Sequence, residues 1–442
     1  MRAFTFKGLF LTAVFMLLGC LTIQAADDDL ITKQITIKLD KAGTLPDRIT
    51  SSKKYKITNL KIIGEINGTD FRMIREMAGS DYYGGSTEGN LSVLDLSEAK
   101  IVIGGGDCFN GYSCYTSNDV IGNRAFSGCS RLTSLTLPAS ITRIGDDAFC
   151  CCSGLTSLTL PAGITEIGYG AFWGCSGLTS LNLPAGITSI GDDAFYGCSG
   201  LTSITLPAGI TEIGGSAFNG CSRLTSLTLP AGITSIGGGA FYGCSGLTSL
   251  NLPAGITEIG GGAFGFCSGL TSINLPAGIT SIGEYAFYGC SGLTSVTLPA
   301  GITEIGECAF YGCSGLTSLT LPAGLTQIDD YAFSECSGLT SIYVYAEKVP
   351  KIGEDVFTGC DAKKCTVYVP KGTYDDYWLS DFGYFFENIV EFDATGIDKT
   401  TTSTDVEEVS RYSVNGQRLV GPTKGLNIVK YSDGSVKKVA VE

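Results

Sequence analysis

The chain of 442 residues contains no histidine, and this absence excludes several chemistries. A Ser-His-Asp triad, a Cys-His pair and every histidine metal site require the imidazole ring. The cysteines do not replace it in a zinc site, because no Cys-x-x-Cys pair is followed by a second such pair. We therefore expect no cofactor and no metal centre. We also expect no enzyme, because a glycosidase would need two carboxylates across a cleft and a rod of repeats offers none.

Basic residues are nearly missing from the middle of the chain. Between residues 144 and 347 there are fourteen Asp or Glu residues and a single basic residue, Arg223. A surface with this charge repels nucleic acid and anionic lipid. The expected partner is neutral or basic, and nucleic acid is not among the candidates.

Long apolar runs are also rare, and the one that occurs lies near the start of the chain. Arg2 and Lys7 precede an apolar stretch over residues 8–23. The pattern predicts a secretory signal peptide over residues 1–25 that is too short at its apolar centre to be kept as a membrane anchor. The protein is therefore expected to be exported, to the cell surface or beyond.

Two processing routes of this segment remain open. Leu17-Leu18-Gly19-Cys20 is similar to a bacterial lipobox, which would place a lipid on Cys20. Cleavage near Ala25 would instead release the chain. Contact with a membrane is expected only through such a lipid.

Most of the chain consists of one repeated unit, of which residues 154–176 are an example. Its most regular mark is an Ala-Phe pair whose Phe returns every 23 residues, with one last step of 24 to Phe357. The Phe residues stand at 126, 149, 172, 195, 218, 241, 264, 287, 310 and 333. A fixed period of this length indicates a solenoid of stacked coils.

Each coil should present one apolar side to its neighbours. Leu158-Thr159-Leu160 alternates as a strand with one buried face does, and Pro161 should end that strand. A second short extended piece covers residues 164–167, and residues 169–176 should form a 3₁₀-like turn that buries Phe172. The predicted inward set of this coil is Leu155, Leu158, Leu160, Ile164, Ile167, Ala171, Phe172 and Cys175.

The fold class predicted is a β-rich leucine-rich-repeat solenoid of parallel strands over residues 121–370. Residues 26–120 break the period and should form an N-terminal cap with degenerate repeats, including a helix over residues 71–77 capped by Asp70. An aromatic segment, residues 371–392, should be a helical C-terminal cap. Residues 393–408 are expected to be a linker, and residues 409–442 a small β module with hairpin turns at Asn415-Gly416 and Asp433-Gly434.

The repeats resemble the BspA-like family of leucine-rich repeats, also called the Treponema pallidum type, found in bacterial surface proteins. Leu-Thr-Ser-Leu-Thr-Leu-Pro and Ile-Gly-x-x-Ala-Phe-x-Gly-Cys-Ser carry the resemblance over residues 121–360. The resemblance implies a curved surface solenoid and, in some members, binding to host proteins or neighbouring cells. The β module is similar to sorting domains of Bacteroidetes secreted proteins in Tyr-x-x-Asn-Gly-Gln-Arg and Lys-Gly-Leu-Asn-Ile, which favours export.

Eleven of the eighteen cysteines form a ladder. Each stands three residues after the repeat Phe of its coil, from Cys129 to Cys360. We expect buried free thiols that act as small apolar fillers. Cys108 with Cys114, away from the ladder, and Cys360, at its end, with Cys365 could close small disulfide loops. Their oxidation state is left open by the sequence.

The positions that vary between coils are the best candidates for binding. The two residues before each Ala-Phe pair and the one after it change freely, and they are rich in acids and aromatics. The candidate partner-binding residues are Trp173, Tyr196, Tyr242, Tyr288, Tyr311, Asp192 and Asp193. Exposed Tyr and Trp are typical anchors of interfaces. Unconstrained drift in turns is the competing interpretation.

Other readings of the repeats are less well supported. The paired acids, such as Asp146-Asp147, lack the alternating ligands of a calcium loop. The Ser and Thr ladders suit a solvated strand better than an ice-binding surface. The function predicted is an exported surface protein that binds a protein or glycan on another cell or in a matrix. A structural spacer without a ligand is the alternative from another class, and a carbohydrate-binding solenoid is a third.

Overall fold

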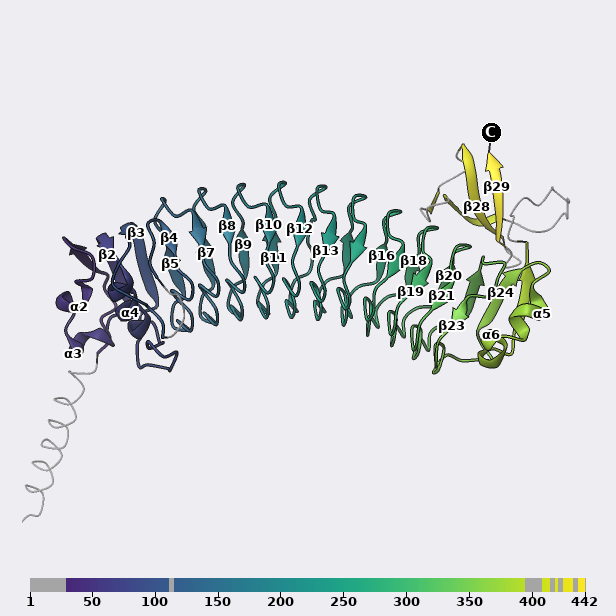
Figure 1. The fold of residues 1–442 in the computed structure, drawn as a ribbon, viewed down its shortest axis with the longest axis horizontal. Coiled ribbons are helices and arrows are strands. Elements are labelled where there is room, and N and C mark those ends of the chain that lie inside the picture. The colour runs from purple at the N-terminus through teal and green to yellow at the C-terminus, as the bar shows by residue number, and fades with distance from the viewer. Residues whose placement is uncertain are drawn as a thin grey trace, which may run out of the picture. The chain divides into compact units, whose positions relative to one another are not determined.

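The computed structural model describes residues 29–110, 115–393, 408–413, 418–419, 424–431 and 436–441. The chain divides into two compact units, Met1–Pro253 and Ala254–Glu442, which are described separately (Figure 1). The expected signal peptide with Cys20, the position of Cys114 and nearly all of the expected linker lie outside the described residues. Within the described part, no helix has the length and apolar character needed to cross a bilayer.

The coil over residues 154–176 folds as its pattern predicts. The strand β7 (Ser157–Thr159) buries Leu158 between an exposed Ser and an exposed Thr, and β8 (Glu166–Ile167) is the second extended piece. The remainder is a series of turns with i→i+3 bonds, such as Cys175 N–H to the carbonyl of Phe172. All eight residues of the predicted inward set are buried.

Corresponding strands of successive coils in the first unit lie in parallel, one coil apart in the sequence. Ser134 pairs with Ser157, and Ile144 pairs with Ile167, each a step of one repeat. One row contains β5 (Ser134–Thr136), β7, β9 (Ser180–Asn182), β11 (Ser203–Thr205) and β14 (Ser249–Asn251). The other contains β4 (Val120–Ile121), β6 (Arg143–Ile144), β8, β10 (Ser189–Ile190), β12 (Glu212–Ile213) and β13 (Ser235–Ile236).

The second unit continues the same coil pattern. One row contains β16 (Ser272–Asn274), β18 (Ser295–Thr297), β20 (Ser318–Leu321), β22 (Ser341–Val344), β24 (Thr366–Pro370) and β25 (Ile389–Phe392). The other contains β15 (Glu258–Ile259), β17 (Ser281–Ile282), β19 (Glu304–Ile305), β21 (Gln327–Ile328) and β23 (Lys351–Ile352). The parallel register is kept to the end, where Val367 pairs with Ile389. The predicted parallel solenoid is confirmed.

The repeat Phe side chains form the centre of each unit. Phe172, Phe195 and Phe218 are fully buried, and their rings stack with centroids 5.4 Å apart and planes within 6°. Offset aromatic stacking adds to the free energy of burial. Stacking of identical rings therefore links each coil to the next.

The ladder cysteines are free thiols, as expected, and nearly all of them are buried. The described bonds run from a thiol to the carbonyl of the Phe in the preceding coil, as from Cys175 Sγ to Phe149 O at 3.1 Å, and Cys360 Sγ has a second bond to the carbonyl of Cys336 at 3.5 Å. Burial raises the pKa of Cys198 to about 12, so this thiol is neutral and unreactive. The ladder therefore contributes weak hydrogen bonds between coils in addition to volume.

The two disulfide loops that the sequence allowed, Cys108 with Cys114 and Cys360 with Cys365, have different outcomes. Cys108 is disulfide-bonded, while its expected partner Cys114 lies outside the described residues. Cys360 and Cys365 are both free, so a bridge between them, the other possibility raised by the sequence, is wrong for this structure. Cys360 instead follows the ladder, with its thiol 3.6 Å from the carbonyl of Phe333.

The N-terminal region contains β1 (Ile35–Leu39), α2 (Leu45–Arg48), α3 (Ser51–Lys54), β2 (Asn59–Ile66), α4 (Gly68–Met77) and β3 (Val93–Ile101). The prediction that Asp70 caps the helix is wrong in detail, because the N-cap is Asn67. Asp70 is the N3 residue, and its carboxylate accepts a bond from the N–H of Asn67 at 2.9 Å. The two side chains form a capping box, which begins the helix three residues earlier than expected.

At the other end, the aromatic segment forms two short helices, α5 (Tyr374–Trp378) and α6 (Asp381–Phe385). The break between them occurs where the hydroxyl of Ser380 accepts a bond from the N–H of Phe382 and caps α6. Phe382 and Phe386 pack against Phe357, the last ring of the stack, at 5.6 and 5.1 Å. The helices therefore cover the exposed end of the Phe stack in this unit.

The last element is an antiparallel sheet in the order β27-β26-β28-β29. Its strands are β26 (Glu408–Ser413), β27 (Arg418–Leu419), β28 (Gly425–Tyr431) and β29 (Val436–Val441). The sheet agrees with the predicted β module. The hairpin turns predicted at Asn415-Gly416 and Asp433-Gly434 lie outside the described residues.

Candidate binding surfaces

The variable residue directly before each Ala-Phe pair has a left-handed backbone. Asp147, Asp193 and Ser216 have φ of 53°, 54° and 52°, and Tyr285 and Tyr331 reach 57° and 58°. Each side chain with a Cβ costs about 1–2 kcal/mol in this conformation. Asp tolerates it better than most residues, but Tyr does not. The two tyrosines are therefore kept at a local energetic cost.

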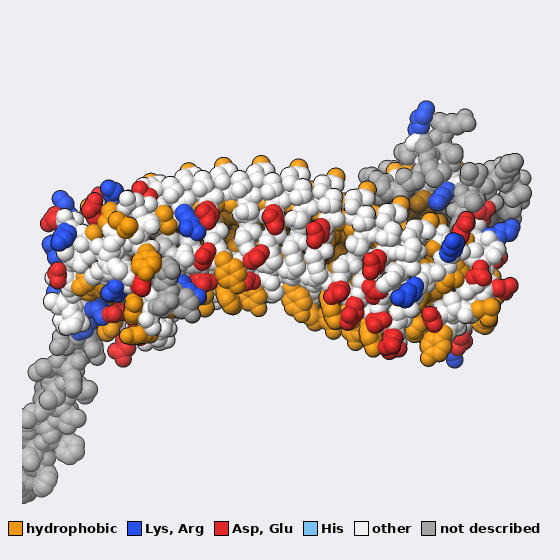
Figure 2. Space-filling view, in the orientation of Figure 1, with side chains coloured by type: hydrophobic (Ala, Val, Ile, Leu, Met, Phe, Trp, Pro, Cys, Tyr) orange, Lys and Arg blue, Asp and Glu red, His pale blue; other side chains and the backbone are white. Residues whose placement is uncertain are grey.

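In the first unit, the candidates Trp173 and Tyr196 meet. Their rings contact edge to face with centroids 5.3 Å apart, and 39% of Trp173 is exposed. Tyr169 is also exposed in the same coil as Trp173, and Tyr242 lies further along this unit. We call Tyr169, Trp173 and Tyr196 the first aromatic patch. In both units, Figure 2 shows hydrophobic side chains gathering along one edge with acidic groups beside them.

The two candidate acids of this unit have different contacts. Asp192 Oδ1 accepts a bond from Gly215 N at 2.6 Å in the next coil, so this carboxylate holds neighbouring backbone in place. Asp193 Oδ2 accepts a bond from the hydroxyl of Tyr169 at 2.5 Å. That bond raises the pKa of Tyr169 to about 12. Asp193 thus contacts the first aromatic patch through Tyr169, whereas Asp192 also stabilises the stacking of the coils.

In the second unit, the candidates Tyr288 and Tyr311 stack at 5.0 Å with planes 8° apart. The ring of Phe266 contacts that of Tyr288 edge to face, with centroids 5.2 Å apart, and the ring centroid of Tyr285 lies 5.7 Å from that of Tyr288. We call Phe266, Tyr285, Tyr288 and Tyr311 the second aromatic patch. Its acid is Glu307, whose Oε1 accepts the hydroxyl bond of Tyr285 at 3.0 Å.

The importance of Phe266 was not foreseen from the sequence. It has a φ of 54° at a position where the next coil has Gly289, which is also left-handed. A comparison of the coils would have shown that Phe266 is unusual, because an aromatic residue stands at a position where the left-handed backbone favours glycine. Phe266 is 44% exposed.

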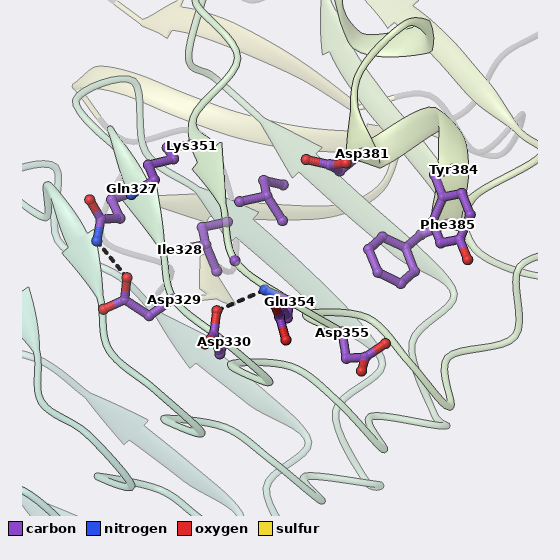
Figure 3. Close-up of a pocket in the computed structure, with 12 residues that line it drawn as sticks. Gln327, Ile328, Asp329, Asp330, Lys351, Glu354, Asp355, Asp381, Tyr384 and Phe385 are labelled. Atoms are coloured by element: carbon purple, nitrogen blue, oxygen red, sulfur yellow. Dashed lines mark hydrogen bonds between the residues drawn. The ribbon is translucent and has the colours of Figure 1, made fainter.

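A hollow of about 570 Å³ lies in the second unit between the last coils and α6 (Figure 3). Asp381, Tyr384 and Phe385 of α6 form one wall. The opposite side contains Gln327, Ile328, Asp329, Asp330, Lys351, Ile352, Gly353, Glu354 and Asp355. Acidic groups outnumber the single Lys, so the hollow suits a cationic group. The sequence did not predict this site.

The paired acids do not assemble into a metal site. Asp146 and Asp330, like Asp192, accept bonds from backbone N–H groups of the next coil, at 3.0 and 2.7 Å. Over the residues that the structure describes, no three His, Cys, Asp or Glu side chains are arranged to hold a metal ion. The acids of the turns therefore have a structural role and a surface role.

The model of the BspA type leucine rich repeat region matches residues 109–224, 165–281 and 257–375, which together cover more than half of the chain. The chain belongs to the BspA-type leucine-rich-repeat family. Members of this family are repeat solenoids that are generally not enzymes and are associated with protein interaction and the cell surface. No curated protein matches the chain.

Several solved structures similar to the chain are described as leucine-rich-repeat or leucine-rich proteins. One from Bacteroides ovatus is 26% identical, covers 64% of this chain and 90% of its own, and has a TM-score of 0.41. A leucine rich cell surface protein from Faecalibacterium prausnitzii is 27% identical over 78% of this chain and 89% of its own, with a TM-score of 0.43. The T. pallidum leucine-rich-repeat protein is 30% identical over 42% and 78%, with a TM-score of 0.33.

Proposed function

We propose that this protein is exported to the cell surface and binds a basic macromolecule, most simply a protein, through the aromatic and acidic edge of its coils. The observation that carries the proposal is the set of exposed aromatic side chains at left-handed turn positions, above all Tyr285 and Phe266. Glycine or Asp would serve these turns at less cost. Backbone strain of this kind is concentrated at functional sites.

The charge of the coils supports a basic partner. Residues 144–347 include fourteen acidic residues and one basic residue, so this region is negatively charged. The hollow beside α6 is also lined mainly by acidic groups. A basic protein would be attracted by this field before contact. Desolvated contacts would then come from the aromatic patches.

Export is supported by the sequence at the start of the chain. Arg2 and Lys7 followed by the apolar residues 8–23 have the composition of a secretory signal. A lipid on Cys20 would hold the solenoid at the membrane, and cleavage near Ala25 would release it. Labelling of the expressed protein with a radioactive fatty acid, compared with a Cys20→Ala variant, distinguishes the two routes.

The direct test is a binding screen of the protein without residues 1–25 against matrix proteins, basic proteins and glycans. We expect at least one basic protein to bind, with association slowing as salt is added, because exposed charges are screened over about 8 Å at physiological ionic strength. Binding only to glycans would support the carbohydrate alternative. No binding to any class would support a structural spacer.

The aromatic contribution is tested by a double change, Trp173→Ala with Tyr196→Ala. We expect the dissociation rate of the bound protein to rise by about tenfold or more, since truncated aromatic anchors act mainly on dissociation. Asp193→Asn should mainly lower the association rate. Surface plasmon resonance measures both rates.

The matched control is a double change on the exposed face of β9, Ser180→Ala with Asn182→Ala, two exposed strand residues that flank the buried Leu181. Both rates should stay unchanged. If these changes abolish binding and the Trp173 and Tyr196 changes do not, the binding surface is the sheet and the edge hypothesis is wrong.

A further inference from the structure

One coil of the first unit carries two cysteines in place of its usual turn residues. Cys150 occupies the position of Trp173 in the next coil, and Cys151 the position of Gly174. Neither belongs to the buried ladder, whose member in this coil is Cys152. Cys151 is exposed, and Cys150 is half-buried.

The backbone at Cys151 has the conformation of the glycine that it replaces. Its φ is 60°, and that of Gly174 is 68°. Its N–H donates to the carbonyl of Trp173 at 2.6 Å, so the turn keeps the contact between coils. A cysteine is less favourable than glycine here, because its Cβ crowds the left-handed backbone. The fold itself therefore gives no reason for a cysteine at this position.

The two sulfur atoms lie side by side. Cys150 Sγ donates to Cys151 Sγ over 3.5 Å. This bond lowers the pKa of Cys151 to about 6, and the same contact together with burial raises the pKa of Cys150. One thiol is thus exposed and readily ionised, and the other is protonated and adjacent. Cysteines that exchange with disulfides have this arrangement of an attacking thiolate and a resolving thiol.

We propose that Cys150 and Cys151 form a thiol–disulfide exchange site for low-molecular-weight disulfides. The Cys151 thiolate attacks one sulfur of the small disulfide, an S–S bond forms to Cys151, and the released thiolate takes up a proton. Cys150 then loses its proton and attacks Cys151 Sγ, which expels the second small thiol and closes a bridge between the neighbours. Two protein thiols are oxidised, and one small disulfide is reduced to two thiols.

The bridge should be easily reversed. Adjacent Cα atoms are about 3.8 Å apart, which is below the range of about 4.4–6.8 Å usual for disulfides. A strained, exposed bridge is a labile one. The site therefore acts as a reversible modification site.

The test uses the full folded chain, the probe oxidised glutathione, and mass spectrometry of the peptide that contains both cysteines. We expect this peptide to lose two hydrogen atoms, and dithiothreitol to restore it. Cys150→Ser should accumulate one glutathione on Cys151, because no resolving thiol remains. Cys151→Gly, which restores the residue of the next coil and should fold, should leave Cys150 unmodified.

The matched control is Cys308, which also has a left-handed backbone (φ 53°) but is buried and has no adjacent cysteine in the sequence. In the native protein, Cys151 should react at least about tenfold faster than Cys308 or the ladder thiols. Equal rates at all these thiols would overturn the proposal. A stable glutathione adduct in the unaltered chain, as in Cys150→Ser, would show that Cys150 does not resolve it and would also overturn it.

Discussion

Phe195→Ala should lower the free energy of unfolding by about 3–5 kcal/mol, the usual loss when a large buried aromatic ring is removed. Phe195 is fully buried and stacks on Phe172 and Phe218, both at 5.4 Å. The change leaves a cavity and interrupts the ring stack on both sides. Because each coil is supported only by its neighbours, the damage cannot be shared across a larger core.

The matched control is Tyr196→Ala, one residue later in the same coil. Tyr196 is only half-buried, so its loss should cost much less. Urea unfolding followed by circular dichroism compares the two variants, and a broadened transition of Phe195→Ala would indicate that the array unfolds in parts. Equal losses of stability would contradict the assignment of the Phe row to the core and the next row to the surface.

Asp70→Ala should be the second most damaging change, with an expected loss of about 3–4 kcal/mol. The buried carboxylate of Asp70 accepts bonds from the N–H groups of Gly43, Leu45 and Asn67 at 2.6, 2.9 and 2.9 Å. Alanine removes all three acceptor contacts, and each buried donor left without a partner costs about 1–3 kcal/mol. The helix α4 also loses its capping box.

Asp70→Asn is the control, because it keeps one acceptor oxygen and the volume of the side chain. It should cost clearly less than Asp70→Ala in urea unfolding. Hydrogen exchange should show the loss concentrated in α2, α4 and the preceding loop. An Asp70→Ala protein as stable as the unaltered one would mean that these three N–H groups find other acceptors, and that the loop at Gly43 does not depend on α4.

Much of the coil could be predicted because the repeats serve as their own alignment. Leu158, Phe172 and Cys175 return at one spacing with little change, and a position that must always be apolar is a buried position. The structure agrees for the whole inward set. The free state of the ladder cysteines followed from the same logic, since side chains at one position of every coil point the same way into the core.

The arrangement of the candidate partner-binding residues was predicted only in part. The pairs Trp173–Tyr196 and Tyr288–Tyr311 do meet across neighbouring coils, since equivalent residues of stacked coils lie about 5 Å apart. Asp192, a candidate partner-binding residue, also has a structural role, because its carboxylate accepts a bond from Gly215 N of the next coil. A sequence does not show whether a turn carboxylate faces solvent or a backbone N–H of the next coil.

The sequence by itself determined the period, the parallel coils, the buried rows and the acidic character, because all of these depend on local patterns that repeat. Only the tertiary structure decided which turns are left-handed, that Asn67 and Asp70 share the capping of α4, and that Cys150 and Cys151 have opposite environments. It also decided the hollow beside α6, whose walls come from three separate segments, residues 327–330, 351–355 and 381–385. Such features depend on side chains that meet only after the coils have stacked.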